Sequence, residues 1–397
     1  MPKNTSMQRN LNSSELRVSV VHSLSEVSAD AWNRLGDTSY PFTRHGFLHG
    51  LEQHGCLEPF GWYPVHFLLH RDAQLIAAVP CYIKTNSYGE LVFDHAWVDA
   101  YQRSGLEYYP KLVTAIPYTP ATGDRFLIDL ATIVEPAEQA RLRDILCRAI
   151  QGFCSEQKMS SWHILFAEKA VLDELAGHDL LLRNDVQFHW QNDNYRDFDD
   201  FLARLSSRKR KNIKRERRSV TDQGLDIGMQ PGGSLNGDEW QRIHDLYAGI
   251  YHRKYGTATL TAEFFRHLGE QMPDQVLVVT ARDQDYIVAA SLFFRSATHL
   301  YGRVWGCDEF FRHLHFESCY YQGIDYCIAE KLQCFDPGAQ GEHKLSRGFL
   351  PTRTWSAHWI AHPQFREAIE QFLRQERRYL DSYRDDLLEH SPFKSAE

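Results

Sequence analysis

The sequence predicts an α+β protein in which one fold occurs twice. Residues 65–84 and 276–295 align without a gap, at a constant offset of 211 positions (Val276 against Val65). Each stretch reads as an apolar strand, a charged turn and a second apolar strand, which is the pattern of a β-hairpin. Similar helical stretches, FLHGLEQHG (47–55) and FFRHLGEQM (264–272), precede the two hairpins. Strands that come in runs, mixed with helices, favour the α+β class.

The similarity between the two halves continues after the hairpins. A strand ending in Phe93…Trp97 matches one ending in Tyr301…Trp305, and a Tyr-Tyr pair follows each, at 108–109 and 320–321. A repeat of about 200 residues indicates a duplicated domain, because solenoid repeats are much shorter. The length of 397 residues also fits two domains.

The first half contains a polar lead-in followed by one complete domain. We expect a disordered lead-in over 1–15 and an N-terminal domain over 16–195. Periodicity predicts strands over 17–21, 65–71, 74–84, 90–97, 125–130, 161–167 and 180–191. Helices are expected over 26–35, 44–54, 106–115 and 136–157, the last opened by Pro136.

The second half repeats this order as a C-terminal domain over 196–397. It begins with a basic helix over 199–221, which Gly224 ends. We then expect a strand at 225–229, helices at 238–251 and 261–272, three strands, a helix at 317–332, a short strand, a glycine-rich segment, a strand at 354–360 and a final helix from Pro363.

This element order resembles that of the GNAT acyltransferase fold, and longer motifs resemble one family in particular. The motifs are PFTRHGFLHGLEQHG, GWYPVHFLL and IPYTPATGDRFL in the first half, and SRKRKNIKRER, LYGRVWG, LHFESCYYQGIDYCI and FDPGAQGEHKLSRGFLPTRTWSAHWI in the second. Over about residues 17–394 the chain is similar to the FemAB-like N-acyltransferases, bacterial proteins associated with peptidoglycan biosynthesis or recognition. The resemblance implies two tandem GNAT-like domains. It also implies transfer of an acyl or aminoacyl group to an amine.

Composition narrows the classes of protein that fit. The net charge of −8 argues against a nucleic-acid binder in which the whole surface is basic, but not against a local basic patch. Eight scattered cysteines without a CxxC pair read as buried free thiols of a cytoplasmic protein. No apolar run reaches membrane-spanning length, and the N-terminus lacks a signal-peptide pattern.

The glycine-rich segment near the C-terminus carries the densest chemistry. Gly338-Ala-Gln-Gly-Glu-His-Lys344 is followed by Arg347. Glu342 and His343 are candidate bases for an attacking amine, while Lys344 and Arg347 could hold an anion or an oxyanion. The alternative is a polar turn whose charges pair with one another. Related tandem GNAT enzymes carry an aromatic-Lys pair here, and His343 replaces the aromatic residue.

A central strand of the second half carries a second group of candidates. Tyr301, Arg303 and Trp305 alternate on one strand face, which suits a carboxylate or phosphate ligand. His315 and Glu317 follow at the start of a helix. We count Arg303 and Glu317 with the catalytic candidates, and Tyr301, Trp305 and His315 with the substrate-binding ones. An arginine paired to a core carboxylate is the alternative. We expect no metal, because the zinc motifs are incomplete.

The first half offers a third group, at predicted strand ends beside aromatic residues. It consists of Lys84, Glu90, Asp94, Trp97, Tyr109 and Lys111. Charged groups in such positions indicate a cleft, and we expect them to bind the acceptor. A tight turn at Gly89 is the alternative for the segment 86–89 alone.

The basic run 208–218 is the fourth candidate. Its first cations, Arg208, Lys209, Arg210 and Lys211, could contact the phosphates of tRNA or of a nucleotide. A solvated charged face is the alternative.

The usual acetyl-CoA pyrophosphate loop is not recognisable in either half. We therefore expect no bound cofactor, with acyl-CoA or aminoacyl-tRNA as co-substrate and a peptide or small-molecule amine as acceptor. The duplication favours a monomer. A non-catalytic module that binds a cell-wall peptide or nucleotide-sugar, and a tRNA or RNA binder acting through 208–218, remain alternative functions.

Overall fold

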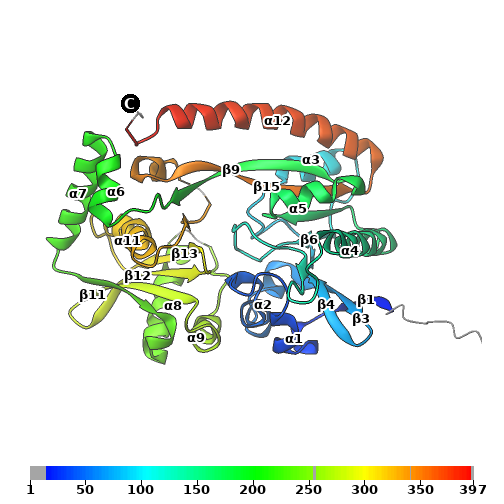
Figure 1. Ribbon diagram of the computed structural model, residues 1–397, viewed down its shortest axis with the longest axis horizontal. Coiled ribbons are helices and arrows are strands. Elements are labelled where there is room, and N and C mark those ends of the chain that lie inside the picture. The colour runs from blue at the N-terminus through cyan, green and yellow to red at the C-terminus, as the bar shows by residue number, and fades with distance from the viewer. Residues whose placement is uncertain (1–14, 254–255, 340, 395–397) are drawn as a thin grey trace, which may run out of the picture.

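A computed structural model describes residues 15–253, 256–339 and 341–394 (Figure 1). Almost all of the expected lead-in lies outside the described residues. The first half contains β1 (Leu16–Val21), α1 (Ala29–Asn33), α2 (His45–Gln53), β2 (Trp62–Pro64), β3 (His66–Arg71), β4 (Gln74–Val79), β5 (Tyr82–Lys84), α3 (His95–Arg103), β6 (Lys111–Thr114), β7 (Leu127–Ile128), α4 (Pro136–Glu156), β8 (Ser161–Leu165), α5 (Lys169–Glu174) and β9 (Leu181–Gln191).

The second half contains helices and strands in the same general order. They are α6 (Phe198–Arg204), α7 (Ser207–Thr221), β10 (Asp226–Pro231), α8 (Gly237–His252), α9 (Ala262–Gln271), β11 (Val276–Asp283), β12 (Tyr286–Arg295), β13 (His299–Cys307), α10 (Leu314–Phe316), α11 (Gln322–Ala329), β14 (Cys334–Asp336), β15 (Leu350–Ile360) and α12 (Pro363–Glu389). In the described residues, no helix is both long and apolar enough to cross a membrane.

The two predicted hairpins, β3–β4 and β11–β12, are confirmed as antiparallel pairs. Their turns carry left-handed residues at Asp72 (φ 56°) and Gln284 (φ 55°), so the structural offset is 284 − 72 = 212. The gapless alignment at 211 is therefore wrong by one residue. A slip of one residue exchanges the two faces of a strand. The sequence could not fix the register, because both hairpins are buried on both faces and lack polar alternation.

The last strand of each half pairs with the other half. The larger sheet has the order β10-β11-β12-β13-β14-β9-β15-β8-β6-β5-β2. Strand β9, from the first half, lies between β14 and β15, while β15, from the second half, lies between β9 and β8. The two long strands run side by side across both halves of the molecule, just beneath α12 (Figure 1). The two halves therefore share one sheet across their junction.

An aromatic core also joins the halves. Phe42, just before α2, packs against Phe294 of β12 and Tyr301 of β13, with ring centroids 4.9 and 5.1 Å apart. Helices α2 and α9, which contain the FLHGLEQHG and FFRHLGEQM stretches, contact each other. The junction is therefore packed like a protein interior. Packing of this kind holds the residues around a cavity in place.

The predicted strand at 90–97 is wrong. Residues 85–110 form a long insertion between β5 and β6, whereas only residues 296–298 separate β12 from β13. Trp97 lies on α3, where Trp97 and Tyr101 bury one helical face. A strand does not form before it, since Leu91 has φ 61°. The helical spacing of the two aromatics outweighs the apolar run that suggested a strand.

The predicted helix at 106–115 is wrong too. Pro110 follows a cis peptide bond and lacks the N–H that a helix needs. Residues 111–114 instead form β6, which pairs with β5 and β8. The Tyr-Tyr pairs are consequently not equivalent, because Tyr320 and Tyr321 lie on a helical turn.

Three other expected elements are interrupted. The strand at 74–84 divides at Pro80 into β4 and β5, which belong to different sheets. The basic helix divides at Leu205 and Ser206 into α6 and α7. The helix at 317–332 begins earlier, at Leu314, and contains a π-turn over Glu317–Tyr321.

Candidate active site

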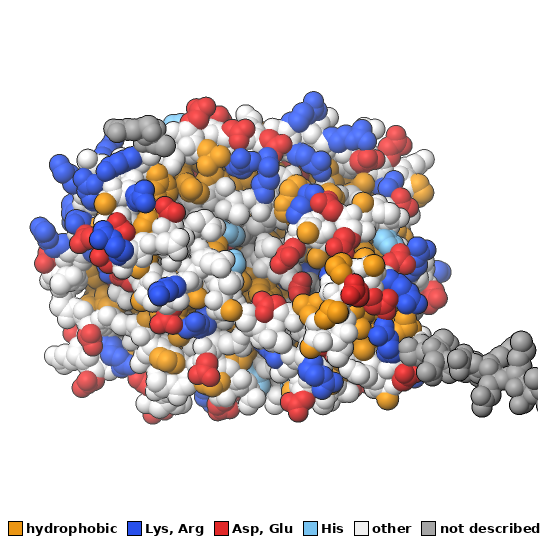
Figure 2. Space-filling view, viewed as in Figure 1, with side chains coloured by type: hydrophobic (Ala, Val, Ile, Leu, Met, Phe, Trp, Pro, Cys, Tyr) orange, Lys and Arg blue, Asp and Glu red, His pale blue; other side chains and the backbone are white. Residues whose placement is uncertain are grey.

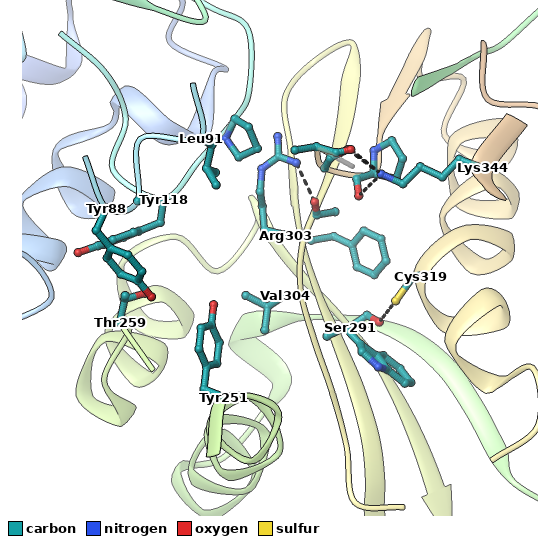
Figure 3. A pocket seen from close by; sticks show the side chains of 18 of the residues that line it. Tyr88, Leu91, Tyr118, Tyr251, Thr259, Ser291, Arg303, Val304, Cys319 and Lys344 are labelled. Atoms are coloured by element: carbon teal, nitrogen blue, oxygen red, sulfur yellow. Dashed lines mark hydrogen bonds between the residues drawn. The ribbon is translucent and has the colours of Figure 1, made fainter. Parts of the chain in front are cut away.

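A cavity of about 740 Å³ lies at the junction between the halves (Figure 3). Its lining comes from the insertion after β5, from the segment around Tyr118, from the end of α8 and from strands β12 and β13. The helical turn at Cys319 and the glycine-rich segment complete it. Volume and lining both fall in the range of small-molecule sites.

Arg303 lies at a bulge in β13. Its neighbours Gly302 and Val304 pair with consecutive residues of β12, which leaves Arg303 as the extra residue. Bulges redirect side chains, and residues 302–305 all line the cavity. The guanidinium pairs with Asp336 at 2.9 Å. Burial alone would raise the pKa of Asp336, but attraction from Arg303 and His189 outweighs it and holds that pKa at about 2.

Lys344 is the second cation of the cavity. It is 3% exposed, and its Nζ donates to the carbonyl oxygens of Gly338 and Ala339 at 2.7 and 3.1 Å. Gly338 has φ 90°, a conformation that favours glycine. Burial lowers the pKa of Lys344 to about 8, although nearby Asp336 opposes the shift. At neutral pH the ammonium group is present but close to losing its proton.

His343 and His315 supply neutral imidazoles on the same side of the cavity. His343 Nε2 lies 2.9 Å from the hydroxyl of Tyr320. Burial and the nearby cations Arg347 and Lys344 lower the pKa of His343 below its ordinary value. Burial, with His343 as the next cause, lowers the pKa of His315 to about 4. Both rings are therefore neutral near pH 7, but the low pKa of His315 makes it a weak base.

Four predicted residues of the second half lie outside this cavity. Glu342 is exposed and accepts a hydrogen bond of 2.6 Å from Tyr383 of α12. Glu317 is buried and paired with Arg217 of α7 at 2.9 Å. Arg347 pairs with Glu216 at 2.9 Å, and Tyr301 belongs to the aromatic core. Of the group around Lys344 and Arg303, the structure brings together Arg303, Trp305, His315, His343 and Lys344.

The charged residues of the first half are gathered, but behind the cavity rather than in it. Lys111 is fully buried and pairs with both Glu90, at 2.8 Å, and Asp94. Burial raises the pKa of Glu90 to about 7 against the attraction of Lys111. Lys111 also donates to Ser87 Oγ at 2.9 Å, and Ser87 contacts the hydroxyl of Tyr109 at 2.8 Å. Ser87 and Tyr109 both line the cavity, so they connect this buried network to it.

The network continues away from the cavity through a row of hydrogen bonds. Tyr108 donates to Asp94 at 2.6 Å, and its oxygen lies 3.1 Å from His163 Nε2. His163 and His358 are joined at 2.7 Å between their Nδ1 atoms, and Trp97 packs against the ring of His358. Burial lowers the pKa of His163 to about 3, so this end of the network is neutral.

Lys84 is likewise buried, with its Nζ 4.0 Å from the centre of the Trp62 ring. It donates to the carbonyl of Tyr88 at 3.0 Å, and Tyr88 lines the cavity. Burial lowers the pKa of Lys84 to about 7, although Glu90 opposes the shift. Lys84 therefore supports the cavity lining from behind.

The basic helix α7 separates into an inner and an outer side. Glu216 and Arg217 face inward and pair with Arg347 and Glu317. The other cations, Arg208, Lys209, Arg210, Lys211, Lys214, Arg215 and Arg218, are exposed or half-buried. Figure 2 shows blue side chains gathered at the edge of the molecule where Figure 1 places α7. The helix therefore offers a basic surface beside the second half.

Sequence reasoning missed much of the cavity lining. The missed residues include Tyr88, Leu91, Tyr118, Tyr251, Thr259, Val304, Ser291 and Cys319. Ser291 Oγ lies 3.1 Å from Cys319 Sγ. A serine inside the apolar run of β12 was a usable signal, since an isolated polar residue in a buried strand needs a partner. The aromatic residues gave none, because aromatic side chains are equally common in cores.

The fold and cavity define an α+β protein whose two similar halves share one sheet, with a candidate substrate site between the halves. Residues 23–395 match the FemAB-like family, described as peptidoglycan biosynthesis/recognition, and the chain belongs to that family.

Comparison with the solved structure of FemX agrees with this fold. The crystal structure of FemX is 9% identical in sequence, with a TM-score of 0.51 over 89% of this chain and 100% of that one. A tandem GNAT protein from the clavulanic acid biosynthesis pathway, also 9% identical, aligns over 88% of this chain and 99% of that one with a TM-score of 0.40. No curated protein sequence matches the chain. At 9% identity the likeness to FemX bears on the fold alone.

Proposed function

We propose that the protein is an N-acyltransferase that moves an acyl or aminoacyl group to an amine in the cavity between the halves. The observation that carries the proposal is the convergence of Arg303, Lys344 and His343 on one cavity whose other side bears the hydroxyls of Ser87 and Tyr109. Membership of a family described as peptidoglycan biosynthesis/recognition supports a precursor peptide as the acceptor.

The residues present suit each step of acyl transfer. The amine nitrogen attacks the donor carbonyl carbon, and His343, neutral near pH 7, takes the proton that the nitrogen loses. Negative charge builds on the carbonyl oxygen, where Lys344 and Arg303 stabilise it. The bond from that carbon to the donor oxygen or sulfur then breaks, and the leaving atom takes a proton from His343 or from water.

Placement of the two reactants follows from the two sides of the cavity. On the first-half side, the hydroxyls of Ser87 and Tyr109 can hydrogen-bond an acceptor peptide. Lys111, which is paired with Glu90 and Asp94, holds Ser87 in place, and Lys84 holds the neighbouring Tyr88. Outside the cavity, the exposed cations of α7 offer a surface to donor phosphates, whether of tRNA or of CoA.

A binding module without catalysis is the second candidate. Lys344 already donates to two backbone carbonyls at 2.7 and 3.1 Å, so a structural role for it does not require a substrate. Turnover separates the two candidates. A catalyst forms a new amide, whereas a recognition module only binds.

The test is a paired screen of purified protein. Thermal shifts are measured with CoA, acyl-CoAs, uncharged tRNA, aminoacyl-tRNA and a UDP-linked precursor peptide. A ligand at about 100 times its Kd adds roughly 2.7 kcal/mol of stability, which a melting curve resolves. Donor and acceptor that each stabilise the protein are then incubated together, and mass spectrometry looks for the acyl adduct on the acceptor. Stabilisation by the acceptor alone, with no adduct from any donor, would replace the transferase by the recognition module.

A further inference from the structure

One lobe of the cavity is built from carbon surfaces. We define the aromatic lobe as Tyr88, Leu91, Tyr118, Tyr251, Thr259 and Val304, all of which line the cavity. These side chains gather on one side of Arg303, away from Cys319 and Lys344 (Figure 3). Three of the six are tyrosines, and two are aliphatic.

Two of the four hydroxyl groups of this lobe are hydrogen-bonded within the protein. The hydroxyl of Tyr118 donates to the carbonyl of Cys56 at 2.6 Å. The hydroxyl of Thr259 lies 3.2 Å from that of Tyr247. Tyr118 also packs edge-on against Trp62, with ring centroids 5.8 Å apart, so its ring is held in place. The ring of Tyr118, the methyl group of Thr259, Leu91 and Val304 thus present carbon to a ligand, while the hydroxyl of Tyr251 points into the cavity (Figure 3).

None of the six residues of the lobe carries a cation, and Arg303 beside it is already paired with Asp336 at 2.9 Å. Lys84, behind the lobe, lies over the Trp62 ring and donates to backbone carbonyls, and burial lowers its pKa to about 7. Lys111 is already paired with Glu90 and Asp94. A diphosphate or a carboxylate buried against this lobe would remain unpaired, at a large cost in free energy.

We propose that the aromatic lobe holds a large apolar side chain, aromatic or branched aliphatic, carried by one of the two reactants. The proposal rests on the transfer function above and names its substrate class. Val304 follows Arg303 directly on β13, so a reactant whose carbonyl contacts Arg303 can place its side chain in the lobe. A glycyl or alanyl group would leave the carbon surfaces of the lobe uncovered.

Binding of unreactive probes tests the lobe without turnover. N-acetyl-L-phenylalaninamide, N-acetyl-L-leucinamide and N-acetylglycinamide carry neither a free amine nor an activated ester. Calorimetry is expected to find the phenylalanine and leucine probes bound at least about tenfold more tightly than the glycine probe, from the apolar surface they bury. Equal binding of all three probes overturns the proposal.

Two variants locate the preference. Val304→Phe fills the lobe and is expected to abolish the preference, whereas Val134→Phe, at a site 66% exposed and outside the cavity, should leave it unchanged. Tyr251→Ala, which removes a ring from the lobe, is expected to weaken the phenylalanine probe several-fold and serves if Val304→Phe does not fold. A preference that survives in both lobe variants also overturns the proposal.

Transfer assays assign the side chain to its source and keep this proposal separable from the function. One arm varies the donor group (phenylalanyl, leucyl or glycyl) at a fixed acceptor, and the other varies the acceptor side chain at a fixed donor. A preference for the large group in either arm supports the lobe and names the reactant. If the protein turns over but prefers no side chain in either arm, the proposal for the lobe is refuted and the proposed transferase function stands. If the probes bind selectively but no donor and acceptor react, the proposal for the lobe stands and the proposed transferase function is refuted.

Discussion

The two sides of the central cavity contain the same kinds of charged residue in different settings. On the second-half side, Arg303 and Lys344 line the cavity. On the first-half side, Lys84 and Lys111 are fully buried behind it. The insertion 85–110 explains the difference, since it places Ser87, Tyr88 and Tyr109 between the lysines and the cavity. Charge at a strand end therefore does not by itself mark a substrate contact.

The comparison predicts a large loss of stability when the buried network is broken. Lys111→Met leaves Glu90 and Asp94 buried without their cation. Removing one partner of a buried pair costs about 3–5 kcal/mol, and urea unfolding should show this loss. Lys169→Met is the control, because Lys169 pairs with Asp173 at the surface and such pairs contribute about 1 kcal/mol or less. Equal losses in the two variants would contradict the buried network.

Lys84 predicts how the stability of the protein depends on pH. Its pKa is lowered from 10.5 to about 7 in the folded protein. Between those values the unfolded chain binds more protons than the folded one, so this residue makes stability rise as pH increases from about 7 to 10.5. Lys84→Met should flatten that part of the stability curve. An unchanged slope, measured by urea unfolding at several pH values, would mean that folding does not lower the pKa of Lys84.

The second-half cations predict the pH dependence of turnover. Activity should rise through the pKa of His343, which lies below 6.5, and fall above the pKa of Lys344, about 8. Each limb should approach about a tenfold change per pH unit. Lys344→Arg keeps a positive charge at high pH and should move the alkaline limb upward. If kcat/KM of this variant keeps the same alkaline limb, another group is responsible for it.

Helix α7 gives the smallest expected effect on stability. Arg208→Ala combined with Lys211→Ala removes exposed charges and should change the free energy of unfolding by less than about 0.5 kcal/mol. Arg217→Ala, on the inner side of the same helix, should cost about 1–3 kcal/mol because Glu317 loses its partner. If α7 serves the donor, only the double variant should weaken tRNA or CoA binding selectively, and that binding should fall with salt.

The sequence predicted the fold class and both hairpins, because long apolar strands around charged turns are specific to that structure. It misplaced residues 90–97 and 106–115, where the first half departs from the second. The repeat itself caused these errors. The strand around Tyr301…Trp305 in the second half was used to predict a strand at 90–97 in the first half. Residues 90–97 instead belong to the insertion 85–110, which the second half lacks.

For the candidate site too, some features could be read from the sequence and others could not. Local motifs identified Arg303, His343 and Lys344, since glycine-rich and strand-centred charges are visible in sequence. They could not show that Glu342 turns toward Tyr383 or that Glu317 pairs with Arg217, because those partners lie on α12 and α7, far away in the chain. The aromatic lobe depends on four separate segments and was not predictable from any one of them.

The most direct test of the account compares two buried lysines that the sequence assigns to different candidate groups, Lys344 and Lys84. Lys344→Met and Lys84→Met are assayed for amide formation with the donor and acceptor identified by the screen, and for melting temperature. Removing a cation that stabilises the oxyanion should lower kcat by about 100- to 1,000-fold. We expect that loss in Lys344→Met, while Lys84→Met, once folded, retains kcat within about tenfold. If Lys344→Met keeps full activity, or if only Lys84→Met loses it, the cations that serve the reaction are not those of the second half.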